Sequence, residues 1–180
     1  MDKPIKKFTL HKRWWFWVLI GIILFLFVII VASSSDQQSS TPVPTQNVAN
    51  TAVSSLSTNQ AYRNAVIASV VPFLESGAQD IQMSVNDASG QDFVGALSNA
   101  KGAQAAFATA KKNYDALPLV PANMTEENTL IGRAITSYQQ ASEELISGIN
   151  TLNPSIINAA GAHITEATEY IKQATNLVTQ

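Results

Sequence analysis

The sequence predicts an all-α protein with an N-terminal transmembrane helix, a flexible linker and an antiparallel bundle of three or four helices. Three observations predict it. An uncharged apolar run spans residues 14–32, apolar residues recur at three- and four-residue spacing from about residue 58 onward, and strand-type alternation is nearly missing. The 180-residue chain contains no cysteine, which excludes disulfides, thiolate metal sites and cysteine nucleophiles.

The run at residues 14–32 has the dimensions of a membrane span. Its 19 residues extend about 28 Å as an α-helix, close to the hydrocarbon thickness of a bilayer. Trp14, Trp15 and Trp17 stand at its first turns, where aromatic rings favour the headgroup region. The sequence therefore predicts a single-pass signal-anchor whose partner is the lipid bilayer.

The charges predict the orientation of that anchor. Residues 1–13 carry five basic side chains against one acidic one, so this tail should stay in the cytoplasm, and residues 58–180 should lie outside it. A cleaved secretory signal is the alternative, because Val31-Ala32-Ser33 offers small residues to a peptidase. The anchor is favoured because the apolar run exceeds the usual length of a signal peptide.

Residues 33–57 predict a disordered linker. They are rich in Ser, Thr, Gln and Asn, and Pro42 and Pro44 lie close together. No apolar periodicity would bury a face of this segment. We expect it to space the helical domain from the membrane.

Four helices are predicted after the linker. The first begins at the capping box Ser57–Gln60, and Pro72 and Gly77 leave it either kinked or split. The second follows Asp92, the third is capped by Thr125 and the fourth by Asn153, which precedes Pro154. Large and small residues alternate along the last three helices, as in a coiled-coil seam. The second helix has this pattern at Phe93, Ala96, Ala100, Ala103, Phe107, Ala110, Tyr114 and Leu117. The third has it at Ile131, Ala134, Tyr138, Ala141, Leu145, Gly148 and Leu152, and the fourth at Ile157, Ala160, Ile164, Ala167, Ile171, Ala174 and Val178.

The register of the predicted hairpins brings three aromatic residues to one level. If the last two helices form a hairpin that closes near Asn153, residues whose numbers sum to about 307 lie level, which pairs Tyr138 with Tyr170. The preceding helix adds Phe107. These rings form either a core layer, which we favour, or a small-ligand pocket between helices.

The same register places His163 level with Glu144, so we expect a surface ion pair. A pH-sensitive latch is the alternative for this pair. His163 and Glu166 also share a helix face, but three or four convergent ligands are needed for a metal, so no metal site is expected. Asn123 begins an N-glycosylation sequon, Asn-Met-Thr, in a predicted loop.

The sequence contains no catalytic or cofactor-binding motif that we identify, and its charge balance gives no sign of nucleic-acid binding. We therefore expect a non-enzymatic domain that needs no cofactor and serves as an interaction or scaffold protein of the cell envelope, with an envelope protein as partner. The alternative is an extracytoplasmic ligand-binding or sensing bundle that acts with a partner protein. Homo-oligomerisation is left open, although residues 14–32 lack a G-x-x-x-G face.

Two stretches of the chain carry a resemblance. The start, KKFTLHKRWWFWVLIGIILFLFVII, resembles the anchors of small surface proteins of Gram-positive bacteria and some archaea. Residues 121–179 resemble a helical hairpin of uncharacterised extracytoplasmic domains from those organisms, through Pro121, Tyr138, Gly148-Ile149, Asn153-Pro154 and Tyr170-Ile171. The resemblance implies a membrane-anchored helical bundle and brings no catalytic residues.

Overall fold

The computed structural model describes the backbone of residues 48–178 and the side chains of residues 58–178. Every element in this part of the chain is a helix, so the all-α prediction is confirmed for it. The predicted tail at residues 1–13, the predicted transmembrane helix at residues 14–32 and the linker up to residue 47 lie outside the described residues. Among the helices that the structure does describe, none has the length and apolar character needed to span a bilayer.

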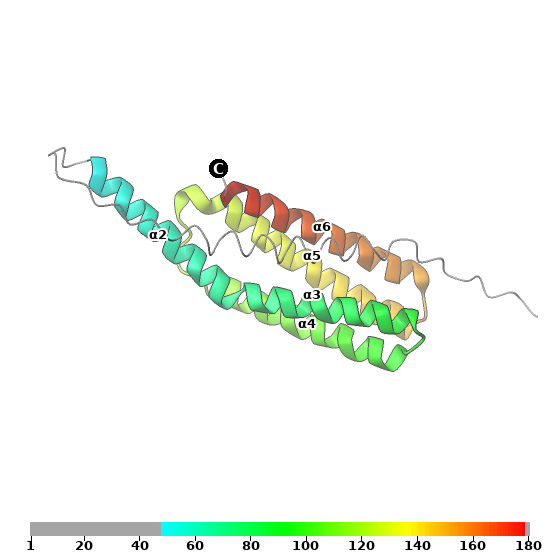
Figure 1. The fold of residues 1–180 in the computed structure, drawn as a ribbon. Helices are drawn as coiled ribbons and strands as arrows, with labels where there is room; N and C mark the ends of the chain where they lie inside the picture. The colour runs from blue at the N-terminus through cyan, green and yellow to red at the C-terminus, as the bar shows by residue number, and fades with distance from the viewer. Residues whose placement is uncertain (1–47, 179–180) are drawn as a thin grey trace, which may run out of the picture. The chain divides into compact units, whose positions relative to one another are not determined.

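Five α-helices and one short 3-10 helix follow one another along the chain (Figure 1). They are α2 (Val48–Ser69), α3 (Val71–Ser89), α4 (Phe93–Asp115), η1 (Ala122–Met124), α5 (Thr125–Asn150) and α6 (Pro154–Val178).

Helix α2 begins at Val48, inside the segment that the sequence predicts as linker. Residues 48–57 are therefore helical, and the capping box at Ser57–Gln60 falls inside a helix instead of starting one. The reason is local. No glycine or proline occurs between Pro44 and Pro72, so nothing stops a helix from extending backward toward the Pro42–Pro44 region.

The first predicted helix is split rather than kinked. Val70 separates α2 from α3, and Figure 1 shows the two helices running in different directions. Pro72 lies in the first turn of α3, where its missing N–H leaves no hydrogen bond unmade. Gly77 does not interrupt α3; it is buried within that helix.

The α3–α4 hairpin closes with a Schellman turn. The backbone N–H of Asp92 donates to the carbonyl of Asp87 (2.9 Å), and that of Gln91 donates to the carbonyl of Ala88 (3.2 Å). Gln91 takes the left-handed conformation, with φ 66°. The side chain of Asp92 then caps α4 by accepting from the N–H of Gly95 (2.9 Å), which confirms the predicted start of this helix.

The α5–α6 hairpin repeats that turn. The N–H of Asn153 donates to the carbonyl of Gly148 (2.8 Å) and that of Leu152 to the carbonyl of Ile149 (3.2 Å). Leu152 is left-handed, with φ 49°. Asn153 caps α6 by accepting from the N–H of Ser155 (3.0 Å), and this predicted cap is confirmed as well.

Thr125 does not act as the predicted cap of the third bundle helix. Its hydroxyl donates to the carbonyl of Ala122 (3.0 Å), and its backbone is already helical, with φ −59° and ψ −39°. The cause is η1, which runs directly into α5, so that the backbone has turned helical before Thr125 is reached.

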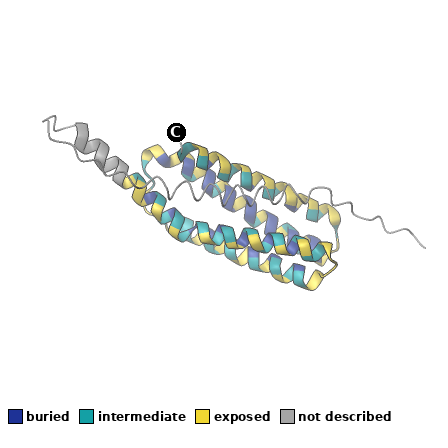
Figure 2. Ribbon diagram, in the orientation of Figure 1, coloured by how far each residue is buried: buried dark blue, intermediate teal, exposed yellow. Residues whose placement is uncertain are grey.

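Helices α3 to α6 form an open antiparallel array in which each packs against the next, with α6 at the edge against α5. Figure 2 shows the buried residues on the facing sides of these helices. On α6 the small residues Ala160, Ala167 and Ala174 are buried, whereas the isoleucines between them are half-buried, because only one helix covers them.

Two residues of the predicted stripes, Phe93 and Leu152, are instead exposed at the helix ends.

The core itself is mostly aliphatic and alanine-rich. Its buried hydrophobic residues are Tyr62, Val66, Val70, Leu74, Ile81, Ala96, Ala100, Ala103, Phe107, Ala110, Met124, Leu130, Ile131, Ala134, Ile135, Tyr138, Ala141, Leu145, Ile149, Ala160, Ala167 and Ala174. Alanine at every second contact lets helix axes approach closely, and the larger residues fill the remaining space.

Candidate functional site

The three aromatic residues singled out from the sequence do not form one group. Phe107 on α4 and Tyr138 on α5 stack with ring centroids 4.9 Å apart and planes inclined by 7°. Both are buried, and burial raises the pKa of the Tyr138 hydroxyl above its ordinary value. Tyr170 is half-buried and lies away from this stack, on the outer side of α5. The Phe107–Tyr138 pair is thus a layer of the core.

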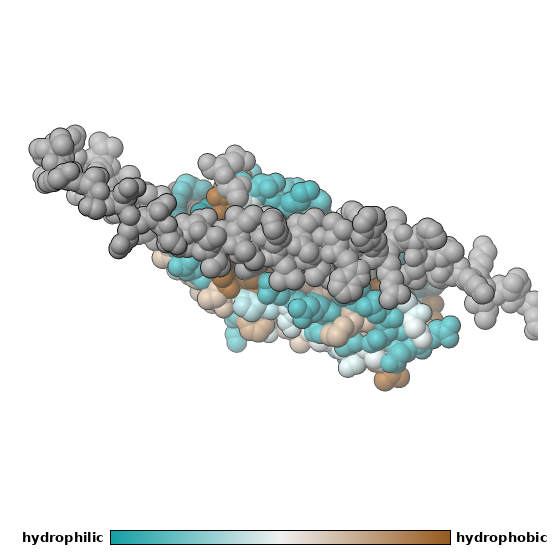
Figure 3. Space-filling view, in the orientation of Figure 1, coloured by the Kyte–Doolittle hydropathy of each residue, from teal (hydrophilic) through white to brown (hydrophobic). Residues whose placement is uncertain are grey.

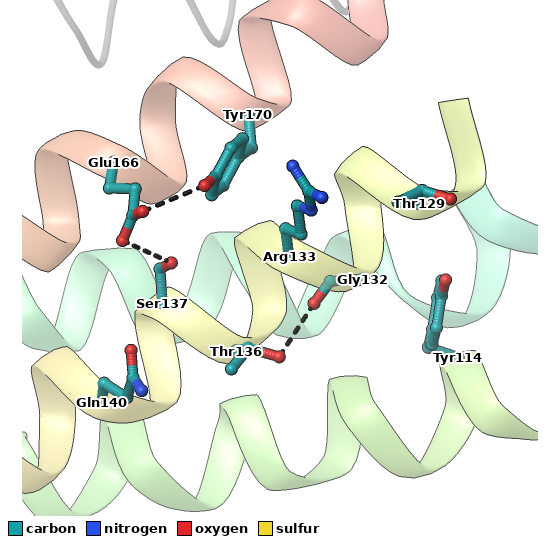
Figure 4. A pocket seen from close by; sticks show the side chains of 9 residues that line it. All are labelled: Tyr114, Thr129, Gly132, Arg133, Thr136, Ser137, Gln140, Glu166 and Tyr170. Atoms are coloured by element: carbon teal, nitrogen blue, oxygen red, sulfur yellow. Dashed lines mark hydrogen bonds between the residues drawn. The ribbon is translucent and has the colours of Figure 1, made fainter. Parts of the chain in front are cut away.

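Tyr170 instead lines a groove of about 500 Å³ that runs along α5 between α4 and α6 (Figure 4). Helix α5 provides most of the lining, Tyr114 comes from α4, and Glu166 and Tyr170 come from α6. The lining residues are Tyr114, Thr129, Gly132, Arg133, Thr136, Ser137, Gln140, Glu166 and Tyr170. This volume falls within the range of small-molecule sites.

Gly132 allows α4 to approach α5 at the floor of the groove. A Cβ at this position would lie 2.8 Å from the hydroxyl oxygen of Tyr114, which is closer than real Cβ contacts. The Tyr114 hydroxyl therefore sits over the bare backbone and donates to the carbonyl of Asn128 (2.8 Å). Burial raises the pKa of Tyr114, so this hydroxyl keeps its proton at neutral pH.

The carboxylate of Glu166 organises the α6 side of the groove. It accepts hydrogen bonds from the hydroxyls of Tyr170 and Ser137, each at 3.0 Å (Figure 4). The hydrogen bond from Tyr170 is the main cause that lowers the pKa of Glu166 below its ordinary value, and the same bond raises the pKa of Tyr170. Glu166 is therefore ionised at neutral pH, and it links α6 to α5 through Ser137.

Arg133 supplies the positive charge of the groove. Its guanidinium carbon lies 5.8 Å from the centroid of the Tyr170 ring, a cation–π distance. No ion pair joins Arg133 to a carboxylate among residues 58–178. The guanidinium, which carries five N–H donors, thus presents hydrogen-bond donors at the groove surface without a carboxylate of its own.

The hydroxyl groups along the α5 wall have their protons engaged elsewhere. Thr129 donates to the carbonyl of Thr125 (2.8 Å), and Thr136 donates to the carbonyl of Gly132 (3.1 Å). Together with Ser137, Tyr114 and Tyr170, these groups offer oxygen lone pairs to the groove rather than protons. The wall is therefore rich in acceptors, with Arg133 and the amide of Gln140 as the side-chain donors.

The imidazole of His163 lies beside the groove, between two carboxylates. Its Nε2 is 3.5 Å from Glu144 Oε1 on α5, and its Nδ1 is 3.5 Å from Glu166 Oε2 on α6. All three side chains are partly exposed. The structure therefore brings His163 and Glu144 to the same level, as the hairpin register predicts, and adds Glu166 as a second neighbour.

The remaining predicted positions lie apart from the groove. Asn123 is exposed in η1. Within residues 58–178, no group of three or more histidine, aspartate or glutamate side chains is placed to hold a metal ion.

Sequence reasoning missed most of the groove, including Arg133, Ser137 and Gln140. A usable signal was present, because the register that pairs Tyr138 with Tyr170 also puts Ser137 at that level. Polar residues on a helix usually indicate no more than a solvated face, so the pattern alone does not single out a groove there.

No family model matches this chain, and no curated protein or solved structure shows a significant match to it.

Proposed function

We propose that this protein is a single-pass, membrane-anchored, non-enzymatic interaction domain that acts on the extracytoplasmic side of the membrane. The anchor rests on the uncharged run at residues 14–32 and the basic tail before it. The resemblance to membrane-anchored helical-bundle proteins of Gram-positive bacteria and archaea points the same way. The observation that carries the interaction role is a set of large apolar side chains exposed at one end of the bundle.

That end is formed by the two Schellman turns. Val94 is 84% exposed, Leu152 is 63% exposed and Phe93 is 41% exposed. Helices α4 and α5 are antiparallel with Phe107 beside Tyr138, and counting outward from that pair puts Phe93 level with Leu152. Figure 3 shows a small hydrophobic patch at the α3–α4 end, beside hydrophilic surface. Large apolar side chains exposed together at one end of a domain favour a protein-binding role for that end.

The charges beside this end indicate the chemistry of its partner. Asp87 lies in the last turn of α3 and Asp92 caps α4, and the nearest basic residue along α4 is Lys101. An apolar centre with an acidic rim fits a protein whose binding surface is apolar with a basic rim. We propose an envelope protein of that kind as the partner.

Site-specific photocrosslinking of the full chain in its own cells tests this proposal. A photoreactive residue at Val94 and, separately, at Leu152 should yield an adduct of the same mass. Asp92→Asn, which removes the negative charge but keeps an oxygen that can cap α4, should weaken both adducts. Leu119, which is 94% exposed at the opposite end of α4, provides the matched control. An identical adduct from Leu119, or none from either turn, would contradict the proposal.

The anchor has its own test. A phosphatase reporter that is active only outside the cytoplasm, fused after Gln180, should be active, and the chain should remain in the membrane fraction after a carbonate wash. Recovery of the full chain in the soluble cytosolic fraction would contradict the membrane assignment.

A ligand-binding domain that acts with a partner protein is the second candidate function. It is favoured by the groove along α5, where Arg133 has no carboxylate partner among the described residues. Thermal unfolding of the full chain in detergent against a panel of small metabolites tests it, because a specific ligand raises the unfolding temperature by mass action.

A further inference from the structure

The groove along α5 has a defined hydrogen-bonding character. Its acceptors are the oxygens of Thr129, Thr136 and Tyr114, whose protons are already donated to backbone carbonyls. Its side-chain donors are Arg133 and Gln140. A complementary ligand must therefore carry several O–H donors together with one group that accepts from a guanidinium.

We propose that this groove binds an acidic saccharide, a sugar ring that carries one carboxylate. The carboxylate binds the guanidinium of Arg133, which matches it with two parallel N–H donors. The ring hydroxyls donate to the oxygen of Thr136 and accept from the amide of Gln140. Thr129 lies 11 residues before Gln140 on α5, about 16 Å along the helix axis, so it is beyond the reach of the same ring. This inference rests on the second candidate function above and names its ligand class.

The second charge in the groove restricts the ligand further. Glu166 is ionised and stands on α6, where the hydroxyls of Ser137 and Tyr170 hold its carboxylate in place. A second negative charge on the same sugar ring would be repelled there, whereas the neutral hydroxyls of that ring would donate to its free lone pairs. One carboxylate at the Arg133 end and hydroxyls toward Glu166 satisfy both charges.

The open shape of the groove sets the expected affinity. Arg133 and Glu166 are both exposed, so their charges remain largely hydrated. We therefore expect a dissociation constant on the order of 1 mM for a single sugar unit. A chain of such units, as in an anionic envelope polysaccharide, would contact more of α5 and bind more tightly.

Titration calorimetry of the full chain in detergent, at constant ionic strength, tests the proposal. The probes are sodium D-glucuronate, D-glucose as the neutral sugar, sodium acetate as the carboxylate alone, and a short galacturonate oligomer. Glucuronate should bind at least tenfold more tightly than glucose and acetate. Arg133→Met should weaken glucuronate binding at least tenfold, and Gln140→Ala should weaken it less.

Lys101→Met is the matched control, because it removes an exposed positive charge from α4 outside the groove. Its affinity for glucuronate should equal that of the original chain. Binding that is equal for glucuronate and acetate, or that survives Arg133→Met, would overturn the proposal. Tighter binding of the oligomer than of glucuronate would identify a polymer as the source, and the reverse would identify a free sugar acid.

This outcome is separable from the interaction role. The groove lies along the side of α5, whereas Val94, in the first turn of α4, and Leu152, in the α5–α6 turn, lie at the end of the bundle. If no saccharide binds, the crosslinks at Val94 and Leu152 should be unaffected. If the crosslinks fail, saccharide binding can still be measured.

Discussion

The ring of Phe107 occupies the space that a side chain at Gly77 would need. A Cβ built on Gly77 would overlap three carbon atoms of that ring. Gly77 lies on α3 and Phe107 on α4, and both are buried. The glycine therefore serves close packing between two helices rather than interrupting one of them.

Gly77→Ala should destabilise the protein by about 1–3 kcal/mol, because the added methyl group overpacks the core. This loss runs against helix propensity, which favours alanine over glycine by about 1 kcal/mol. Gly161→Ala is the matched control, since nothing lies within 4 Å of a Cβ built there. It should stabilise α6 by up to about 1 kcal/mol. Thermal unfolding in detergent, followed by circular dichroism, measures both, and equal shifts in one direction would refute the packing argument.

The two hairpin turns hold non-glycine residues in the left-handed conformation. Gln91 and Leu152 have φ values of 66° and 49°, where an L-residue costs roughly 1–2 kcal/mol relative to glycine. Both are exposed, so replacing them removes little packing. Gln91→Gly and Leu152→Gly should each raise stability by about 0.5–1 kcal/mol, less than the full strain because glycine also loses more backbone entropy on folding.

Gly90→Ala is the control, because Gly90 lies one residue before Gln91 and has a negative φ. This variant relieves no left-handed strain, so it should not show the same gain in stability. A fall in unfolding temperature for Leu152→Gly would mean that its side chain packs.

The same turns show which parts of the fold could be predicted. The sequence predicts Asp92 and Asn153 as helix caps because capping residues act locally, through their own side chains and the next few amides. The sequence also predicts that His163 and Glu144 lie at the same height along the hairpin, because two antiparallel helices have the same rise per residue. The sequence does not predict the left-handed conformation of Gln91 and Leu152, because glycine is the usual residue at that position and Gly90 lies one residue before Gln91.

Other features depend on contacts that the sequence pattern does not contain. Tyr138 on α5 and Tyr170 on α6 lie near one level, but the rotation of each helix about its own axis places Tyr138 in the core and Tyr170 in the groove. The half-burial of Ile164 likewise reflects the edge position of α6, which is a matter of how many neighbours the helix has. Periodicity identifies the apolar face of a helix, and it leaves open how many helices cover that face.

Helix α2 is tied to the start of α5 by an ion pair. Arg63 lies 3.1 Å from Glu127, whose side chain is only 9% exposed. Arg63→Met leaves this carboxylate nearly buried without its partner, and it should destabilise the protein by about 1–3 kcal/mol. Lys111→Met breaks the exposed pair with Asp115 and should change stability by less than about 1 kcal/mol. Equal losses for the two variants in thermal unfolding would show that the Arg63–Glu127 pair behaves as a surface contact.

The neighbouring tyrosine makes stability depend on alkaline pH. Tyr62 is buried and hydrogen-bonded to the side chain of Asn128, and burial is the main cause that raises its pKa from 10.0 to about 12. The unfolded chain releases this proton near pH 10, whereas the folded chain holds it until about pH 12. The contribution of Tyr62 to stability is therefore complete below pH 10 and declines as the pH rises toward 12.

Tyr62→Phe isolates that contribution. At pH 8 the variant should be less stable by about 1 kcal/mol, because the hydrogen bond to Asn128 is lost. Between pH 10 and 12 the original chain should lose stability faster than the variant, so their unfolding temperatures should converge. Other tyrosines with raised pKa values that do not interact with Tyr62, such as Tyr138 and Tyr170, are present in both proteins, and their alkaline losses cancel in the difference. A difference that stays constant from pH 8 to 12 would mean that Tyr62 ionises equally well in the folded and unfolded chains.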